Sequence, residues 1–492
     1  MSDAERKNLL GRYRHLLRVV IELAAPLSIG TGDDTLDAAN AVARDANDLP
    51  TIPGTSLAGV LRAAWEARLG VDAAEGLFGY QRRKVRTGRN DEEPADAQRS
   101  RLRVSWGSVH GQDDRPVQGL VPPASIEADP VLAAARGVVR RDHVRLNHRG
   151  VADGRGKHDR ASVMAGHRFS FELEVMSDDP ADDTLAKVVA LLDEPAVRLG
   201  GRTRGGLGAF RVVRHGLRSY DLRDRVDLDA YIARPMRLAE VPLGMAMAPG
   251  KGSGGAPEGV TLALEAVEPW QIGGGDGDGL EAGQSDLLPY TERRVVWSDG
   301  RGAVGEPELV LPASAIKGAL RHRTAFYLRA ADSKLHAHTH PTQDPTQDPK
   351  ADLDWFGPEA LPGIALLFGE IKESAKGTAE ARGRPGCVLI EDVRIPVSAV
   401  NVSTATHVAL DRFTGGPLAG HLYQETRVGD VKLEVTLVVG EPAGRKLKGG
   451  EAEAFAQARA ALDRAIDDLL EERLNLGAGA DRGYGYFKGE RR

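Results

Sequence analysis

The hydrophobic pattern of this chain occurs twice in the same order. In each half an apolar stretch precedes a glycine turn, a polar loop and a segment with helical spacing that follows a proline. We predict first strands over residues 13–25 and 260–267, and helices over residues 55–69 and 314–331. A repeated order of this kind predicts two copies of one fold.

The strongest part of the repeat surrounds the start of each helix. Residues 52–62 read Ile-Pro-Gly-Thr-Ser-Leu-Ala-Gly-Val-Leu-Arg, and residues 311–321 read Leu-Pro-Ala-Ser-Ala-Ile-Lys-Gly-Ala-Leu-Arg. We expect the hydroxyl groups of Thr55 and Ser314 to cap these helices, because a side-chain oxygen can accept from the free amides of the first turn. The tripeptide Leu-Phe-Gly then follows each helix.

Each half continues with two strands, an amphipathic helix and a glycine-rich turn that leads into a last strand. We predict the strands at 102–109, 168–176, 387–395 and 431–439, the helices at 184–193 and 452–472, and the glycine-rich turns within 199–210 and 476–487. The order in each half is β-α-β-β-α-β, which is the ferredoxin-like arrangement. The predicted fold class is therefore α+β, with two tandem ferredoxin-like (RRM-like) domains that carry insertions.

The composition agrees with a globular protein of two domains. We place the first domain at residues 1–240, a linker rich in Pro, Gly, Met and Ser at 241–259, and the second domain at 260–492. The single cysteine, Cys387, excludes an internal disulfide and a zinc site with several cysteines. No apolar run is long enough to cross a bilayer and the chain begins with polar residues, so we expect no membrane partner and a cytoplasmic location.

The charge of the chain is unevenly distributed. The formal net charge is −6, which disfavours general nucleic-acid binding. Arginine and lysine nevertheless crowd residues 82–103 and 140–149. Such segments are either solvated surface faces or local phosphate-binding sites, and the composition leaves both interpretations open.

These motifs together resemble the RAMP superfamily of CRISPR-associated proteins, and in particular the backbone subunits of type III effector complexes. The resemblance rests on the proline-led helix with Gly-x-Leu-Arg, the Leu-Phe-Gly turn, the segment Asp411–Gly416 and the late glycine loops. It implies two modified ferredoxin-like domains that hold CRISPR RNA, with a hairpin that displaces nucleotides from the guide–target duplex. The implied partners are CRISPR RNA, target RNA and other type III effector subunits.

The candidate RNA-binding residues lie on the capped helices, in the glycine loops and in the segment Asp411–Gly416. Helix N-termini and glycine backbones suit phosphates, because free amides can approach them closely, and arginine and tyrosine add charge and stacking surfaces. The alternative for the glycine loops is a tight turn that serves folding only. The candidates are Thr55, Ser56, Arg62, Arg204, Gly205, Gly206, Ser314, Lys317, Arg321, Arg412, Arg482, Gly483 and Tyr484.

Two loop aspartates are candidate catalytic residues. In catalytic members of the resembled family an aspartate lies between the glycine turn and the capped helix, and cleavage needs a divalent metal, here Mg²⁺ or Mn²⁺. Asp286 occupies this loop in the second half, with one additional residue before Pro289. In the first half the alignment places Ala39 at the catalytic position and leaves Asp37 two residues away. The alternative for either aspartate is solvent exposure in a polar loop.

The leading hypothesis is therefore a type III backbone subunit that binds CRISPR RNA and cleaves target RNA through a loop aspartate. The first alternative is a scaffold subunit that binds RNA without cleaving it. A further alternative is a metal-independent endonuclease that processes CRISPR RNA with a histidine base, although such relatives usually lack the proline-led helix. The minimal alternative is a tandem ferredoxin-like protein without an RNA role.

Overall fold

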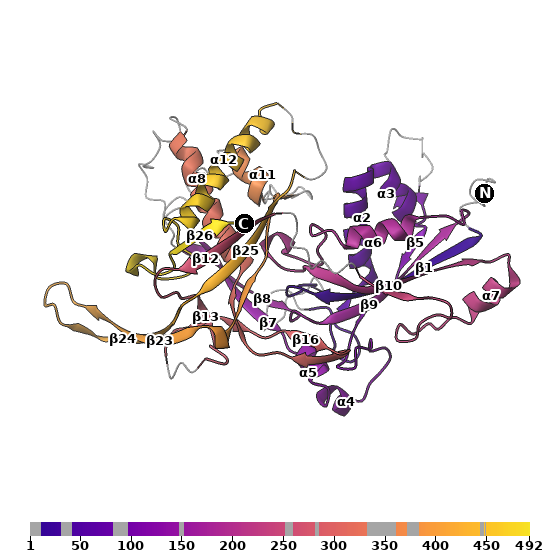
Figure 1. Cartoon of the computed structure of the whole chain (residues 1–492), viewed down its shortest axis with the longest axis horizontal. Coiled ribbons are helices and arrows are strands. Elements are labelled where there is room, and N and C mark those ends of the chain that lie inside the picture. Colours follow the sequence, from indigo (N-terminus) through magenta and orange to yellow (C-terminus); the bar gives the residue numbers. More distant parts are fainter. Residues whose placement is uncertain are drawn as a thin grey trace, which may run out of the picture.

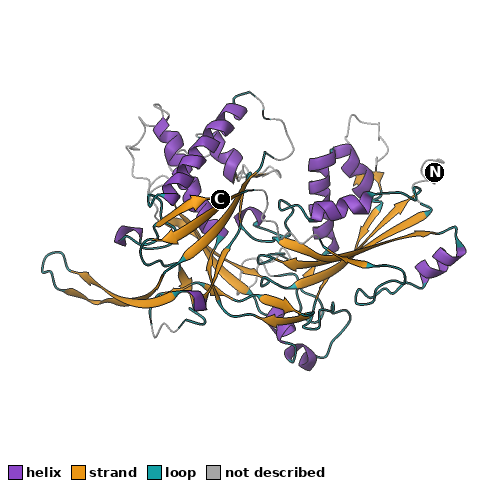
Figure 2. Cartoon of the chain, viewed as in Figure 1, coloured by secondary structure: helices purple, strands orange, loops and turns teal. Residues whose placement is uncertain are grey.

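The computed structural model describes residues 11–30, 42–81, 97–146, 152–250, 259–280, 285–331, 361–370, 383–442, 447 and 449–492. The chain forms two lobes, each built from an antiparallel sheet with helices on one face (Figure 1). Both helical layers lie on the same side of the molecule, and Figure 2 shows the strands of both lobes beneath them. In the described part of the chain, no helix has the length and apolar character needed to cross a membrane.

The first sheet has the ferredoxin-like strand order. Its core strands run in the spatial order β10-β1-β9-β6, so that the fourth strand of the motif lies beside the first and the third beside the second. The elements are β1 (Tyr13–Leu23), β2 (Thr51–Ile52), α2 (Gly54–Leu69), α3 (Val71–Phe78), β5 (Leu102–Val104), β6 (Gly107–Val109), β9 (Arg168–Ser177), α6 (Thr184–Leu192) and β10 (Phe210–Asp221).

The second sheet repeats this order as β26-β12-β25-β21. Its elements are β12 (Val260–Ala266), α8 (Ala313–Ala331), α11 (Pro362–Phe368), β21 (Val388–Ile390), β25 (Lys432–Val439), α12 (Glu451–Leu470) and β26 (Phe487–Arg491). Two halves of one topology are what the repeat predicts, and the predicted α+β class with two ferredoxin-like domains is confirmed.

Strand alternation explains how each sheet buries its helix-facing side. On β9, Phe169, Phe171 and Leu173 are fully buried in the core beneath α2 and α6. Their neighbours Ser170 and Glu172 point to the opposite face, because successive side chains of a strand alternate. The apolar residues on one face therefore fix the register, and the polar residues collect on the other.

The helix starts differ from the predicted hydroxyl caps. Pro53 is the N-cap of α2 and makes no side-chain capping bond, so Thr55 lies inside the first turn and the predicted cap is wrong. The start of α8 is satisfied from elsewhere, since the amide of Ala313 donates to Oδ1 of Asp392 at 2.8 Å. A carboxylate from a distant loop thus replaces the local hydroxyl.

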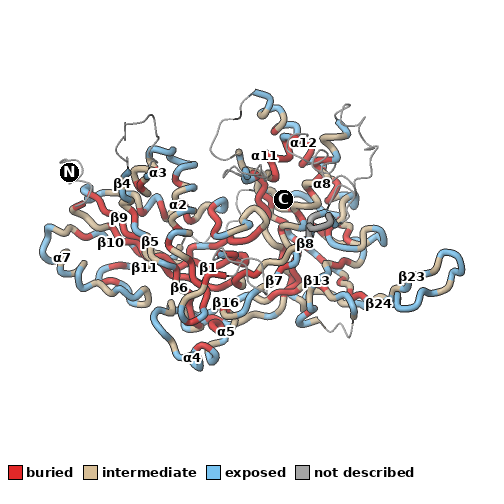
Figure 3. Tube along the Cα trace, turned by 180° about the vertical axis from the view of Figure 1, so that it is seen from behind, coloured by how far each residue is buried: buried red, intermediate tan, exposed pale blue. Residues whose placement is uncertain are grey.

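Two long hairpins interrupt the repeated core at matching places. The first is β7 (Val139–Leu146) with β8 (Ala152–Ser162), and the second is β23 (Asn401–Leu410) with β24 (Pro417–Gly429). The first hairpin lies between the lobes, whereas the second projects away from the body (Figure 1). Figure 3 shows that the projecting part of β23–β24 is exposed along its length.

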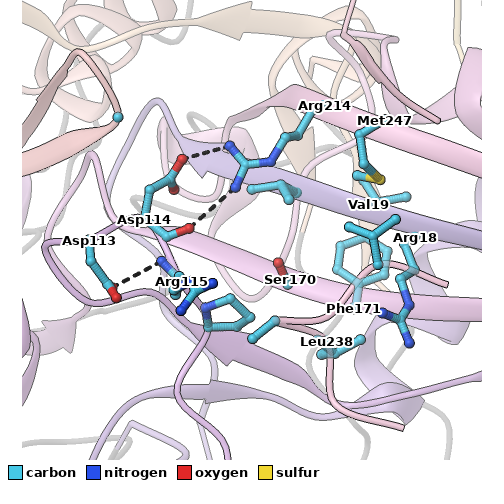
Figure 4. A pocket seen from close by; sticks show the side chains of 15 residues that line it. Arg18, Val19, Asp113, Asp114, Arg115, Ser170, Phe171, Arg214, Leu238 and Met247 are labelled. Carbon is cyan, nitrogen blue, oxygen red and sulfur yellow. Dashed lines mark hydrogen bonds and ion pairs between the residues drawn. The ribbon is translucent and has the colours of Figure 1, made fainter. Parts of the chain in front are cut away.

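Part of the predicted linker belongs to the first sheet. The strand β11 (Met247–Pro249) pairs with β10, and the helix α7 (Arg225–Ile232) precedes it at the far end of the lobe (Figure 1). This extension covers the polar face of the sheet and encloses a cavity of about 330 Å³ (Figure 4). Its lining includes Asp114 and Arg214, which are paired at 2.6 Å.

Shorter elements complete the described chain. They are β3 (Tyr80–Gln81), β4 (Ala97–Gln98), α4 (Pro123–Glu127), α5 (Pro130–Arg136), η1 (Thr203–Gly205), β13 (Gly273–Gly275), β14 (Leu288–Pro289), β15 (Thr291–Glu292), β16 (Val295–Ser298), β17 (Arg301–Val304), β18 (Glu308–Leu311), β19 (Gly369–Glu370), β20 (Arg384–Pro385), β22 (Val393–Pro396), η2 (Val397–Ala399) and η3 (Ala480–Arg482). The predicted single strands at 102–109 and 387–395 are thus each divided in two.

Candidate nucleic-acid interface

The first hairpin is fastened to the second domain by a buried arginine. Arg141 on β7 donates from Nε and Nη2 to the two carboxylate oxygens of Glu292, at 2.6 and 2.9 Å, and from Nη2 to Oδ2 of Asp392 at 2.7 Å. All three side chains are less than 5% exposed. One arginine of the basic segment 140–149 therefore joins the domains, because a guanidinium can bridge two carboxylates.

A second contact runs in the opposite direction, from the β16–β17 hairpin onto the first domain. The indole Nε1 of Trp297 donates to the carbonyl oxygen of Gly166 at 2.8 Å, and the guanidinium of Arg168 lies over the indole ring at 4.3 Å. The amide of Val295 also donates to the carbonyl oxygen of Ala165 at 3.0 Å. Contacts from both sides hold the two lobes in one arrangement.

This arrangement places the first glycine loop against the helix α8. Gly206 has φ +100°, and a Cβ atom at this position would lie 2.5 Å from Cβ of Ala313. Lys317 donates from Nζ to the carbonyl oxygens of Arg204 and Val388, at 2.9 and 3.2 Å. Burial, together with the nearby cations Arg204, Arg198 and Arg321, lowers the pKa of Lys317 to about 8. Lys317 thus fastens the loop of the first domain to the helix of the second.

Two sets of neighbouring cations lie at this junction, Arg160 with Arg202, and Arg198 with Arg204 and Lys317. We call these five residues the junction cluster. Burial lowers the pKa of Arg198, Arg202 and Arg204. For Arg198 the carboxylate of Glu391, 3.6 Å from Nη2, opposes this shift in pKa, while neighbouring arginines lower the pKa further for Arg198 and Arg202. Within the described residues, Nε of Arg160 and Nη1 of Arg198 are buried and have no hydrogen-bond partner. Such a group favours an anion, which would relieve the repulsion and accept from the unpaired N–H groups.

Two histidines of the first hairpin border the junction cluster. The rings of His143 and His158 stack with their centroids 5.2 Å apart, and Nη2 of Arg202 donates to Nε2 of His158 at 2.5 Å. Burial and then the charge of Arg202 lower the pKa of His143 to about 4. His143 is therefore neutral at pH 7 and offers a polar ring rather than a positive charge.

The second glycine loop has a different environment at the base of the β23–β24 hairpin. Arg482 donates from Nη1 to the hydroxyl of Tyr423 at 2.9 Å and from Nη2 to Oε2 of the fully buried Glu425 at 3.1 Å. The guanidinium groups of Arg427 and Arg482 lie over the ring of Tyr484, at 5.1 and 5.6 Å. This loop is open at Gly483, where a Cβ atom would meet nothing within 4 Å.

The candidate catalytic residue Asp286 lies beside the same hairpin. Its backbone amide donates to the carbonyl oxygen of Gln424 at 2.9 Å, and its Oδ2 accepts from the amide of Gln424 at 2.7 Å. The residue is exposed, so Oδ1 faces solvent or a ligand. The other candidate, Asp37, lies outside the described residues.

The remaining predicted RNA-binding residues are spread over both domains. Arg62 donates to the carbonyl oxygen of Gly79 at 3.0 Å and so supports the Leu-Phe-Gly turn. Arg412 lies over the ring of Phe413 at the exposed tip of the second hairpin. Thr55 is exposed at the start of α2, whereas Ser56, Ser314, Arg321 and Gly205 are partly exposed.

The sequence predicted some residues of each site, among them Arg204 and Lys317 at the junction and Arg482 and Tyr484 at the second hairpin, and not others. It selected Arg204 and Lys317 separately, and the structure brings them into contact. It did not select Arg160, Arg202 or Glu425 for RNA binding, because their positions in strand β8, after α6 and in strand β24 show no shared spacing.

The structure therefore has two tandem ferredoxin-like domains, as the repeat predicts, and cations are grouped where the two domains meet. The chain belongs to the RAMP superfamily, because the family model matches residues 20–211 and 263–488, one region in each half. A search of curated protein sequences finds no match.

Among solved structures, the chain is similar to one described as "Cryo-EM structure of the Type III-B Cmr-beta bound to cognate target RNA". The sequence identity is 15% and the TM-score is 0.29, with 44% of this chain and 63% of that chain covered. The match therefore spans less than two thirds of that chain.

Proposed function

We propose that this protein is a backbone subunit of a type III CRISPR ribonucleoprotein, where it binds CRISPR RNA and cleaves complementary target RNA. Its partners would be CRISPR RNA, target RNA and the other subunits of the effector complex. The observation that carries the proposal is the junction cluster, in which cations gather between a glycine loop and a helix start and two of them, Arg160 and Arg198, have a buried N–H group without a partner in the described residues. A chain of phosphates supplies the anions that this arrangement favours.

The path of the RNA follows from the two glycine loops. The first loop and α8 form one site at the junction, and Arg482 with Tyr484 forms a second at the base of β23–β24. Arginine groups can bind phosphates there, and Tyr484 offers a ring on which a base can stack. One RNA strand that crosses both sites would span the two domains.

Asp286 is the proposed cleavage residue, because it presents an exposed carboxylate beside this second site. Mg²⁺ often binds to proteins through one carboxylate together with phosphate oxygens and water, which suits a residue with one oxygen held and the other open. Asp286 would hold such an ion, Mg²⁺ or Mn²⁺, which would supply charge stabilisation at the scissile phosphate. The hydrogen bond from Gln424 keeps the carboxylate in place.

RNA binding is tested with the purified chain and a guide-length single-stranded RNA. Arg202→Gln removes one cation of the junction cluster, and we expect a loss of affinity of about tenfold, with a shallower salt dependence. Arg225→Gln is the matched control, because the Arg225 side chain is 83% exposed on α7 and pairs with Asp229 on the same helix. Equal affinities and equal salt slopes for the two variants would refute RNA binding at the junction.

Cleavage is tested in a reconstituted complex with Asp286→Asn and, separately, Asp37→Asn. The asparagine at 286 can still accept from the amide of Gln424, so the variant removes charge and keeps the hydrogen bond. We expect one target product to disappear with Asp286→Asn. If every product persists in both variants, the chain is a scaffold that binds RNA without cleaving it.

A further inference from the structure

The cavity of the first domain is bordered by a chain of hydrogen bonds that neither proposed RNA site uses. Nε2 of His110 lies 2.7 Å from Oγ of Ser170, and Nδ1 of the same ring lies 2.8 Å from Oδ1 of Asp114. His110 is fully buried, whereas Ser170 and Asp114 line the cavity of about 330 Å³ beneath the extension (Figure 4). A serine thus faces an open space and is joined through a histidine to a carboxylate.

The carboxylate determines which nitrogen of His110 carries the proton. Burial raises the pKa of Asp114, but hydrogen bonds from His110 and Arg214 outweigh burial and lower this pKa to about 2. Asp114 is therefore ionised at pH 7 and can only accept, so Nδ1 of His110 carries the proton. Burial, although opposed by the bond to Asp114, lowers the pKa of His110. The ring is therefore neutral, and Nε2 accepts from the hydroxyl of Ser170.

Ion pairs and strand register hold these groups in place. Oδ2 of Asp114 accepts from Arg168 and Arg214, at 2.9 and 2.6 Å, so Oδ1 remains for His110. Arg214 and Ser170 stand in one row across β10, β1 and β9. Because residues directly opposite each other share one face of a sheet, both side chains point to the face that the extension covers.

The cavity also offers an apolar wall and a further cation. Leu238, Val241 and Met247 of the extension line it, and so does Arg115 (Figure 4). Arg115 is exposed, so the cavity opens to solvent on that side. A short apolar acyl chain suits the wall, and a guanidinium can stabilise the negative charge that develops on a carbonyl oxygen.

We propose that Ser170 is the nucleophile and His110 the general base in the hydrolysis of small carboxylic esters, with Asp114 as the positioning residue and Arg115 as the ligand of the oxyanion. A hydroxyl bonded to a base that a carboxylate orients is the arrangement that acyl transfer requires. The activity goes beyond the proposed RNA binding and does not depend on it.

The reaction balances with water as the second substrate. Oγ of Ser170 attacks the carbonyl carbon while Nε2 of His110 takes the hydroxyl proton, and the oxyanion forms beside Arg115. The bond from the carbonyl carbon to the alcohol oxygen then breaks, and the imidazolium gives its proton to the leaving alcohol. Water attacks the acyl-serine with the same histidine as base, and Ser170 regains its proton as the acid leaves.

The test uses the full chain with 4-nitrophenyl butyrate, whose hydrolysis releases coloured nitrophenolate. In parallel, a fluorophosphonate probe should bond covalently to Ser170, and peptide mass spectrometry locates the label. Ser170→Ala is expected to lower kcat about 100-fold or more and to abolish this label. Ser108→Ala is the matched control, because Ser108 lies directly opposite Ser170 on β6.

Two further variants separate the roles. Asp114→Asn can donate to Nδ1 and so favours the wrong tautomer of His110, and it should lower kcat about 100-fold or more with little change in KM. Arg115→Gln removes a cation from an exposed position and should lower kcat about tenfold or more.

Three results would overturn this inference: no hydrolysis by the folded chain, no label on Ser170, or equal rates for Ser170→Ala and Ser108→Ala. The hydrogen-bonded chain would then serve the fold alone. Each of these results leaves the proposed function standing, because RNA affinity is measured separately and Ser170→Ala should keep it within about twofold.

Discussion

Replacement of Arg141 by methionine tests whether the junction is held by the buried ion pairs. Methionine fills much of the same space, so the main loss is the positive charge between Glu292 and Asp392. Removal of one partner of a buried pair costs about 3–5 kcal/mol. Here Arg394 still pairs with Glu292 at 2.6 Å and the amide of Ala313 still binds Asp392, so we expect the lower end, about 3 kcal/mol.

The assay is urea unfolding, combined with hydrogen exchange in β7 and α8. The loss should appear as a lower unfolding midpoint and as faster exchange in β7, which carries Arg141, and at the start of α8, whose first amide binds the Asp392 carboxylate that Arg141 holds. Arg140→Gln is the control, because the neighbouring Arg140 pairs with Asp159 at 3.5 Å with both side chains partly exposed, and such pairs contribute at most about 1 kcal/mol.

Equal midpoints for Arg141→Met and Arg140→Gln would refute the reasoning. That result would mean that the two carboxylates find other partners or water when the arginine is absent. The junction would then depend on the contacts of the β16–β17 hairpin alone.

Three further predictions concern the junction and the core. Gly206→Ala should destabilise the chain, because the new Cβ atom would lie 2.5 Å from Cβ of Ala313 and φ of this residue is +100°. Gly205→Ala is the control and should not, because a Cβ atom there would meet nothing within 4 Å. Equal thermal midpoints for the two variants would contradict this prediction. Lys317→Met should remove one cation of the junction cluster and lower RNA affinity several-fold in a filter-binding assay, and unchanged affinity would exclude a role for this amine. Burial lowers the pKa of His167 to about 4, so between pH 6.5 and 4 the unfolded chain binds a proton at this histidine and the folded chain does not. The free energy of unfolding should therefore fall by up to about 3 kcal/mol on acidification through this range. Unfolding curves of His167→Leu should lack this part of the pH dependence.

The core of each domain could be predicted from local patterns. The alternation on β9 and the apolar spacing of α12 identify strand and helix without reference to the rest of the chain. The glycine loops are equally local, because residues such as Gly206 and Gly483 adopt positive φ that other residues disfavour. The repeat then gave the strand order, since two copies of one pattern imply one topology.

The sites depended on contacts between distant segments. Lys317 and Arg204 come from different domains, and their hydrogen bond exists only because the domains dock. Arg482 and Glu425 lie in the last glycine loop and on β24, so their ion pair depends on the packing of these two segments.

The sequence alone therefore determined two ferredoxin-like domains, their order and the residues that form their cores, because hydrophobic periodicity and glycine turns act over a few residues. The tertiary structure alone decided that Arg141 joins the domains and that five cations share one junction. Charges act through space rather than along the chain, and so their grouping becomes visible only when the folded domains bring them together.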